Sequence, residues 1–309
     1  MKFNHIALVG LGLIASSIAL ALRSKDTNIK ITGFSKTKKT REEARKIGFC
    51  IVCENYEDCI KGADLVILCV PVCVMSYVTE KISPYLSRSV VVSDVGSVKE
   101  SVVVEVQKKL PKGVFFVPAH PLAGTENSGP SSGFATLFEN RYCILTPSDK
   151  IPLEIINKVR LFWEKLGSNV IEMEAKHHDL VLSVTSHAPH LIAFAMVGVA
   201  DDFSKVTNSE VINYSAAGFR DFTRLAASDP IMWRDVFLNN KDAALEILGR
   251  FTEELFTLQK AIRKKDGEYL LKYFERTRKI RRSIVSAGRR NGIRTVSYTH
   301  LTLPTSDLV

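Results

Sequence analysis

Three short stretches of the sequence combine residue types that suit acid–base chemistry on an anionic substrate. Asp94–Lys99 contains a serine and a lysine, and His120–Glu126 contains a histidine and a glutamate. Ser186–His190 holds two further histidines. Histidine changes its charge near neutral pH and is the most frequent general acid or base in enzymes. These stretches are therefore predicted to contribute to a catalytic site.

Each stretch also has a purely structural explanation when it is taken alone. Ser97 with Glu100 three residues later fits a helix capping box, and His120 fits the cap of a turn. His187 and His190 have the spacing of a metal-binding pair on one helix, but no third ligand stands near them in the sequence. No metal ion is therefore expected.

A glycine-rich turn directly after the first apolar run predicts a dinucleotide site. Gly10-Leu-Gly12-Leu-Ile-Ala15 fits the pattern GxGxxG/A and opens a helix. Gly10 would make the tight turn, and Gly12 would let the backbone approach a pyrophosphate at the helix N-terminus. The residues expected to contact the cofactor at this edge of the sheet are Gly10, Gly12, Leu13, Ile14, Val70 and Pro71.

The end of the second predicted strand favours NADP over NAD. Enzymes that use NAD usually carry an acidic residue there, which binds the ribose 2′-hydroxyl. No acidic residue occurs between Asp26 and Glu42, and Ser35 stands at the strand end. Lysines follow it at positions 36, 38 and 39. Ser35 and Lys36 are therefore expected at the ribose, with NADP as the cofactor and NAD as the alternative.

The first half of the chain must position these residues, and it alternates apolar runs with amphipathic stretches. This alternation is typical of βαβ units and predicts an α/β fold with a Rossmann-type, largely parallel sheet. The expected strands are Ile6–Val9, Ile29–Phe34, Leu65–Val70, Val90–Ser93, Val114–Pro118, Tyr142–Leu145 and Val170–Met173. The expected helices are Ile14–Ser24, Thr40–Ile47, Val74–Ile82, Ser97–Leu110 and Leu153–Leu166.

After Ala175 the pattern becomes helical until about Gly292, and Asp229-Pro230 is a strong helix start. We predict a dinucleotide-binding domain over residues 1–175 and an all-α domain for substrate binding and dimerisation over 176–294. Residues 295–309 contain no lysine or arginine and are predicted to be a tail outside the fold. An apolar stripe fits either an internal core or a dimer seam; it comprises Leu245, Leu248, Leu255, Leu258 and Ile262.

Charge, cysteines and hydropathy limit the class of protein. The net charge of +9 comes mainly from the stretch between Arg263 and Arg290, where acidic residues interrupt the basic ones and no base-stacking pattern of aromatic residues is found. A solvated helical face is expected there, without nucleic acid.

Cys50 and Cys53 have the spacing of a redox pair but no helix N-terminus beside them, so reduced structural thiols in a cytoplasmic protein are expected. The apolar run Ile6–Leu22 is broken by glycines, and later apolar runs are judged too short or too charged to cross a membrane.

Together these motifs resemble the prephenate/arogenate (cyclohexadienyl) dehydrogenase family of tyrosine biosynthesis. The resemblance reaches to about Gly292 and implies oxidative decarboxylation of prephenate or arogenate with NAD(P)+, which yields 4-hydroxyphenylpyruvate or tyrosine. The matching stretches are Gly10–Ala15, Gly96–Lys99, His120–Glu126, Ser186–His190, Gly218–Arg224 and Ser228–Asp235.

The resemblance also implies roles for single residues in a homodimer. His120 would accept the proton of the substrate hydroxyl, Ser97 would hydrogen-bond the same hydroxyl, and Arg224 would bind a carboxylate. Trp233 would either reach the site of a partner subunit or belong to the core, and Arg224 would otherwise pair with Asp221 on the surface. The remaining residues expected at the substrate are Ser186, His187, His190, Thr125, Glu126 and Asp221.

A different class of protein is also compatible with the fold, namely a dinucleotide sensor that binds NADP without turnover. A sensor needs neither His120 nor Arg224, which argues against it. Reduction of hydroxyacids or imines on a similar scaffold would call for a catalytic lysine in the helical domain, and none stands in Ser186–His190 or Gly218–Arg224.

Overall fold

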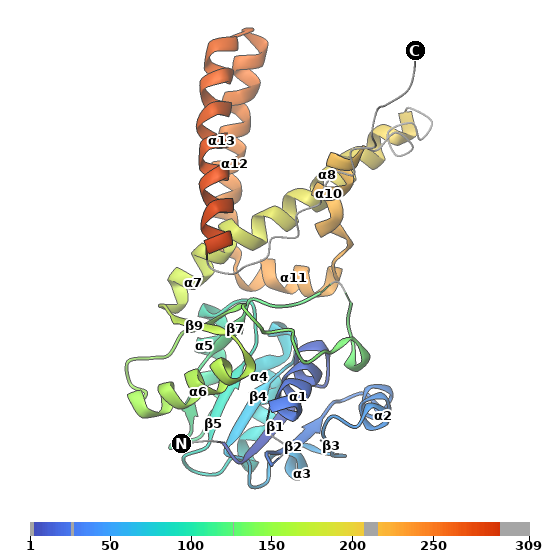
Figure 1. The fold of residues 1–309 in the computed structure, drawn as a ribbon, viewed down its shortest axis with the longest axis vertical. Coiled ribbons are helices and arrows are strands. Elements are labelled where there is room, and N and C mark those ends of the chain that lie inside the picture. The colour runs from blue at the N-terminus through green and yellow to red at the C-terminus, as the bar shows by residue number, and fades with distance from the viewer. Residues whose placement is uncertain (1–2, 26–27, 126, 207–215, 291–309) are drawn as a thin grey trace. The chain divides into compact units, whose positions relative to one another are not determined.

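The computed structural model describes residues 3–25, 28–125, 127–206 and 216–290 (Figure 1). Glu126 and the predicted tail 295–309 therefore lie outside the described residues. The chain divides into two compact units, residues 1–250 and 251–309.

The first unit is built on a six-stranded sheet in the order β3-β2-β1-β4-β5-β6, and all of its strand pairs are parallel. This is the strand order of dinucleotide-binding folds, in which the order reverses between β1 and β4. The strands are β1 His5–Val9, β2 Lys30–Phe34, β3 Ile51–Val52, β4 Leu65–Leu68, β5 Val91–Asp94 and β6 Phe115–Phe116. The connecting helices are α1 Leu13–Lys25, α2 Lys38–Ile47, α3 Tyr56–Ile60, α4 Val72–Ile82 and α5 Glu100–Gln107.

Both faces of this sheet are buried, which explains why its strands are continuous apolar runs. Ile6 and Leu8 of β1 point into one apolar cluster, and Ala7 and Val9 point into another on the opposite face. Because successive side chains in a strand alternate between faces, one short strand contributes side chains to both apolar cores. The predicted largely parallel α/β sheet is confirmed.

A second, smaller sheet differs from the expectation. Its order is β7-β8-β9, with β7 Ala119–Pro121 antiparallel to β8 Tyr142–Leu145, and β8 parallel to β9 Asn169–Glu172. The helix α6 Leu153–Leu166 joins the last two strands. The sequence predicted β8 and β9 but missed β7, because three residues around a proline are too short to show periodicity.

The described residues after β9 are mainly helical, as predicted. The chain forms α7 Ala175–Leu182, a π-helical turn Ser183–His187, α8 Ala188–Val206, α10 Ala217–Thr223, a 3-10 turn Arg224–Ala227, α11 Pro230–Asn239, α12 Lys241–Arg263 and α13 Gly267–Arg290. Asp229 caps α11 by accepting a hydrogen bond from the Met232 amide at 2.8 Å, which confirms the predicted start.

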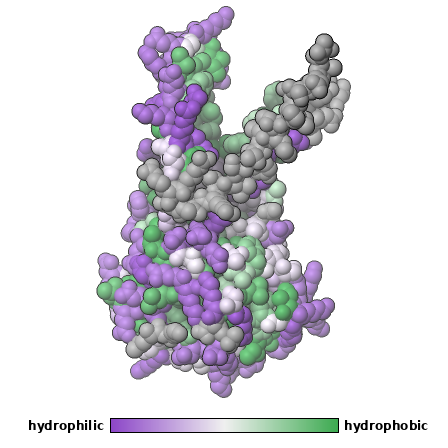
Figure 2. All heavy atoms as spheres, in the orientation of Figure 1, coloured by the Kyte–Doolittle hydropathy of each residue, from purple (hydrophilic) through white to green (hydrophobic). Residues whose placement is uncertain are grey.

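Two apolar surfaces of the helical part are not covered by any of the residues that the structure describes. In the stripe on α12, Leu245 is 58% exposed and Ile262 is 63% exposed, so burial in an internal core does not account for it. Figure 2 shows apolar residues beside hydrophilic ones on α12 and α13. The helical run Ala175–Phe203 is also long and apolar enough to cross a membrane, with a mean hydropathy of 1.6 and only 28% of its most apolar window buried. The expectation that every later apolar run is too short or too charged is therefore wrong, because the run continues through the π-helical turn.

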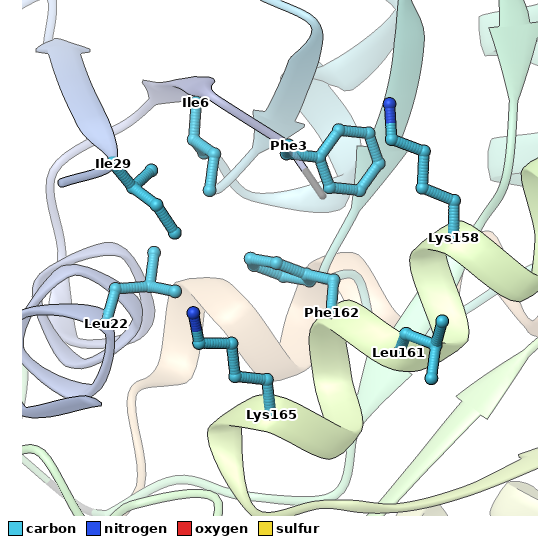
Figure 3. A pocket seen from close by; sticks show the side chains of 8 residues that line it. All are labelled: Phe3, Ile6, Leu22, Ile29, Lys158, Leu161, Phe162 and Lys165. Atoms are coloured by element: carbon cyan, nitrogen blue, oxygen red, sulfur yellow. The ribbon is translucent and has the colours of Figure 1, made fainter. Parts of the chain in front are cut away.

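An apolar pocket lies at the amino-terminal edge of the six-stranded sheet (Figure 3). Phe3 and Ile29 precede β1 and β2, while Phe162 and the ammonium groups of Lys158 and Lys165 come from α6. Lys158 lies over the Phe3 ring at 4.2 Å. The catalytic motifs lie at the carboxyl-terminal edge, so this pocket is not the candidate active site.

Candidate active site

The glycine turn sits between β1 and α1, as the sequence predicts. Gly10 has a φ of 97°, and its amide donates to the Phe34 carbonyl at 2.8 Å. A Cβ at Gly10 would approach the Cys69 carbonyl oxygen to 2.3 Å, so any other residue would force the backbone to move. A Cβ at Gly12 would meet nothing within 4 Å. The turn thus has the open backbone approach and the helix N-terminus that suit a pyrophosphate, and Leu13 and Ile14 open that helix.

The neighbouring strand ends complete the candidate cofactor edge. Val70 and Pro71 follow β4, which pairs with β1. Ser35 and Lys36 follow β2, and the Arg41 side chain reaches their backbone: its Nη1 donates to both carbonyls, at 2.8 and 3.0 Å. The sequence reasoning missed Arg41. Its guanidinium also lies 5.6 Å from the centre of the Phe34 ring, at the end of β2 where a ribose phosphate would require cations.

His120 belongs to a buried chain of hydrogen bonds. It lies on β7 and is 8% exposed. Its Nδ1 lies 2.8 Å from Nε2 of His178, and Nδ1 of His178 lies 2.7 Å from Oδ1 of Asp179. The sequence reasoning missed His178 and Asp179, which stand about sixty residues further along the chain.

These contacts assign the tautomers. A carboxylate only accepts, so Nδ1 of His178 carries the proton that bonds to Asp179, and Nε2 of neutral His178 is then an acceptor. His120 must therefore donate from Nδ1, which leaves its Nε2 without a proton. Burial, followed by the charges of His178 and Lys99, lowers the pKa of His120 well below 6.5. Burial also lowers the pKa of His178, although Asp179 opposes that shift.

Asp179 also caps α5. Its two carboxylate oxygens accept the backbone amides of Lys99 and Glu100 at 2.8 and 2.9 Å. The capping box of Ser97 with Glu100 is therefore wrong, because α5 begins only at Glu100. The unpaired backbone amides at the start of α5 donate instead to the carboxylate of Asp179 on α7. Ser97 is partly exposed on the loop before α5.

A buried ion pair fixes β7 beside β5. Lys99 and Asp94 are both 0% exposed, and the Lys99 ammonium bonds to the Asp94 carboxylate and to the Ala119 carbonyl, the latter at 2.9 Å. Asp94 in turn accepts the Ala119 amide at 3.2 Å and the Gly96 amide at 2.8 Å. Since Ala119 directly precedes His120, this pair holds the backbone that carries the imidazole.

The helical residues that follow α7 place one further predicted histidine, His187, close enough to His120 that its charge adds to the lowering of the His120 pKa. His187 is 1% exposed, and its Nδ1 lies 3.1 Å from Nδ2 of Asn240. Burial lowers the pKa of His187 to about 4. His190 stacks on Trp233 at 3.7 Å and bonds through Nδ1 to the Ser186 carbonyl at 2.8 Å. Trp233 is 7% exposed and packs against Val98 of the same chain.

The remaining predicted residues lie at the surface. Arg224 is exposed on a 3-10 turn that packs on α8, close enough that its charge adds to burial in lowering the pKa of His190. Asp221 is exposed as well, and among the described residues it forms no salt bridge with Arg224, so the alternative of a surface pair between them is not found. Thr125 is exposed on the loop after β7 and accepts the Asn127 amide at 3.2 Å.

The protein combines a parallel sheet that carries a glycine turn with a buried histidine, His120, that contacts His178 of helix α7. This combination defines the class of dinucleotide-dependent dehydrogenases. Two family models match the chain: prephenate dehydrogenase, nucleotide-binding domain, over residues 18–172, and prephenate dehydrogenase, dimerization domain, over 174–276. The chain therefore belongs to the prephenate dehydrogenase family and is an oxidoreductase.

Individual relatives agree with this assignment. A cyclohexadienyl dehydrogenase of Zymomonas mobilis is 42% identical over 90% of this chain and 95% of its own. The structure of prephenate dehydrogenase from Aquifex aeolicus in complex with hydroxyphenyl propionate and NAD+ superposes with a TM-score of 0.86 at 34% identity, covering 92% of this chain and 99% of that one. An arogenate dehydrogenase of Synechocystis gives a TM-score of 0.77 at 26% identity, covering 91% and 99%.

Proposed function

We propose that this protein catalyses the oxidative decarboxylation of prephenate, arogenate or both, with NADP+ as the preferred acceptor and NAD+ as the alternative. The observation that carries the proposal is His120: a buried, neutral imidazole whose Nδ1 is committed to His178, so that Nε2 is free to accept a proton. It lies just beyond the sheet edge that carries the glycine turn. The Zymomonas relative, named for cyclohexadienyl substrates, supports this choice of substrate class.

In the proposed mechanism, Nε2 of His120 and the hydroxyl of Ser97 hydrogen-bond the ring hydroxyl of the substrate. A dinucleotide held at the glycine turn Gly10–Ala15 would supply the hydride acceptor for the carbon that bears this hydroxyl. His120 takes the hydroxyl proton as the C–H bond breaks, and the resulting positive charge is stabilised through His178 by the Asp179 carboxylate. Loss of the ring carboxylate as carbon dioxide makes the ring aromatic and completes the reaction. Arg224 binds a carboxylate of the substrate in two-point fashion.

We further propose that the protein is a cytoplasmic homodimer with a dinucleotide-binding domain over residues 1–175 and a substrate and dimerisation domain over 176–294. The exposed apolar residues of α8 and α12, among them Met196, Val199, Leu245 and Ile262, support a partner chain as their cover. The family description of this region as a dimerization domain favours that cover over a membrane.

A direct assay tests the function. The purified protein is given prephenate or arogenate with NADP+ or NAD+, and reduced cofactor and aromatic product are quantified. We expect equal amounts of the two with at least one substrate. Tight NADP+ binding without turnover of either substrate would favour the sensor and reject the enzyme.

Cofactor choice is expected to depend on Arg41. Arg41→Ala removes the guanidinium beside the Ser35 turn, and we expect KM for NADP+ to rise about tenfold, the size of one charge-assisted hydrogen bond, with little change for NAD+. Arg45→Ala is the matched control, because Arg45 pairs with the same Glu54 carboxylate but does not contact the turn. Equal losses for both cofactors would contradict recognition of the 2′-phosphate.

Arg224 is expected to bind substrate rather than hold the fold. Arg224→Ala should raise KM for the substrate roughly 10- to 100-fold, the range for a lost hydrogen-bonded charge, with a smaller change in kcat. Arg224→Lys should recover only part of the loss, because an ammonium lacks the planar fork. Exposed Arg220 on α10 provides the control Arg220→Ala. An unchanged KM for Arg224→Ala would remove Arg224 from the site.

His178 is expected to act as a positioning residue for His120. His178→Leu removes the acceptor for Nδ1 of His120, and we expect kcat to fall about tenfold or more with little change in either KM, as the loss of one buried hydrogen bond implies. His178→Gln should recover much of kcat, because its amide oxygen can accept the same bond. The neighbouring exposed His177 provides the control His177→Leu. Equal losses in the leucine and glutamine variants would indicate a purely structural role.

A further inference from the structure

Asn240 stands between α11 and α12, and its buried side chain reaches the π-helical turn that follows α7. Its amide nitrogen Nδ2 lies 3.0 Å from the Asp179 carbonyl oxygen, 3.0 Å from Ser183 Oγ and 3.1 Å from His187 Nδ1. Asp179 is also the residue that ends the hydrogen-bonded chain of His120. One side chain of the α11–α12 junction thus contacts both this chain and a second buried histidine.

The contacts of Asn240 decide the tautomer of His187. The backbone carbonyl of Asp179 only accepts hydrogen bonds, so the Asn240 atom that faces it is the amide nitrogen, which only donates. The same nitrogen faces Nδ1 of His187, which therefore carries no proton. Burial lowers the pKa of His187 to about 4, so its ring is neutral at pH 7. The single proton of the neutral ring must then stand on Nε2.

Nε2 of His187 is thus a buried donor, and none of the described residues accepts a hydrogen bond from it. Buried donors normally have an acceptor, so this one indicates a ligand or an ordered water molecule. The ring packs on Trp233 with 6.0 Å between centroids, and the His190 ring stacks on the same indole at 3.7 Å. Nε1 of Trp233 is also buried and has no partner in the described part of the chain. A ligand that brings oxygen atoms into this part of the candidate active site would pair these donors.

We propose that Asn240 is a positioning residue, which holds His187 as the Nε2–H tautomer so that His187 donates a hydrogen bond to an oxygen of the bound substrate. A carboxylate or carbonyl oxygen of the cyclohexadienyl compound accepts such a bond. A ring with its proton on Nδ1 would instead turn a lone pair towards the same oxygen. The hydrogen bond to substrate rests on the proposed function, whereas the tautomer does not.

The neighbouring histidine has the opposite tautomer. Nδ1 of His190 lies 2.8 Å from the Ser186 carbonyl oxygen, which only accepts, so Nδ1 carries the proton. Burial lowers the pKa of His190, which keeps the ring neutral and leaves its Nε2 as an acceptor. The two histidines therefore offer one donor and one acceptor, and only His187 can pair with a substrate oxygen through Nε2.

NMR of the full-length protein tests the tautomer without any substrate. In protein labelled with ¹⁵N-histidine, two-bond ¹H–¹⁵N correlations distinguish a ring proton on Nε2 from one on Nδ1, and His187→Leu assigns the signals by their loss. We expect a proton on Nε2 in wild-type His187. Asn240→Asp should move this proton to Nδ1, because a carboxylate only accepts.

The wild-type protein also tests the contact with the ligand, independently of how any variant folds. Saturation with hydroxyphenyl propionate and NADP+ should shift the Nε2–H proton of His187 downfield, because it gains an oxygen acceptor. If other signals of the candidate active site shift on binding and this proton does not, the proposal is overturned.

Steady-state kinetics measures what the hydrogen bond contributes. Asn240→Asp is expected to raise KM for the substrate about tenfold, the equivalent of one lost hydrogen bond to a charged group, with smaller changes in kcat and in KM for the dinucleotide. In a His187→Leu background the same substitution should change KM no further, because the donor is already absent. Adjacent Asn239 provides the control Asn239→Ala, since its amide donates instead to the Asp235 carbonyl within α11, at 2.8 Å.

Three further results would each contradict the proposal. A proton on Nδ1 of wild-type His187 removes the role of Asn240. A moved proton with an unchanged KM means that Nε2 donates to a water molecule only. A KM that rises equally with and without His187 ascribes the effect to the added negative charge. Absence of turnover by the wild-type protein counts against the proposed function instead, because the tautomer is observed without substrate.

Discussion

His120→Asn is expected to lower kcat by about 10²–10⁴-fold, the usual contribution of a general base. Asparagine is close to histidine in size and keeps an amide to donate to His178, so the buried chain to Asp179 stays paired. It has no group that takes up a proton, so the hydroxyl proton has no acceptor as the C–H bond breaks. Steady-state rates with saturating substrate and dinucleotide measure the loss.

The same assignment fixes the pH profile of the wild-type enzyme. Burial lowers the pKa of His120 well below 6.5, so the neutral, active form is already complete at pH 7. The value of kcat/KM is therefore expected to be flat through neutral pH and to fall only as the pH drops through the lowered pKa. In His120→Asn this acid limb should vanish, while dinucleotide affinity and the melting temperature remain close to wild type. Unchanged turnover in the variant would discard the assigned role.

Lys99→Met is expected to destabilise the protein by about 3–5 kcal/mol, the cost of leaving one member of a buried ion pair alone. Both side chains are 0% exposed, and methionine offers no charge to Asp94 and no donor to the Ala119 carbonyl. The measurement is the free energy of unfolding from urea titration.

The double variant Lys99→Met with Asp94→Asn is expected to recover part of this loss, because no buried charge then remains unpaired. The matched surface pair provides the control: Lys109 and Glu80 lie 2.8 Å apart with both side chains exposed, so Lys109→Met should leave the free energy of unfolding nearly unchanged. If Lys99→Met behaved like Lys109→Met, the buried pair would not be what holds β7 in place.

Features set by local sequence were predictable. Burial on both faces imposes continuous apolar runs, so β1, β2, β4 and β5 could be read directly. The glycine turn was predictable because its backbone requires a glycine that is visible in the sequence. Gly10 has a φ of 97°, and the closeness of Cys69 leaves no room for a side chain at this position. The start of α11 was predictable because Asp229 and Pro230 satisfy the first turn from within their own segment.

The parts that escaped prediction depend on partners distant in the sequence. Asp179 caps α5 from eighty residues away, so Ser97 with Glu100 gave a plausible but wrong local cap. His178 carries no pattern of its own, and its role exists only because β7 brings His120 to it. Arg41 is one of several basic residues on α2, and only the fold of the β2 turn distinguishes it. The π-helical turn, which joins α7 and α8 into one apolar run, also has no local signature.

A crystal structure of the protein with NADP+ and hydroxyphenyl propionate, the ligand bound to the Aquifex relative, would show whether His120 and Arg224 contact one substrate beside the nicotinamide. We expect the phenolic oxygen within about 3.2 Å of His120 Nε2, with Nδ1 still bonded to His178, and the propionate carboxylate on Arg224. A phenolic oxygen remote from His120, or a nicotinamide ring that does not face the same aromatic ring, would contradict it.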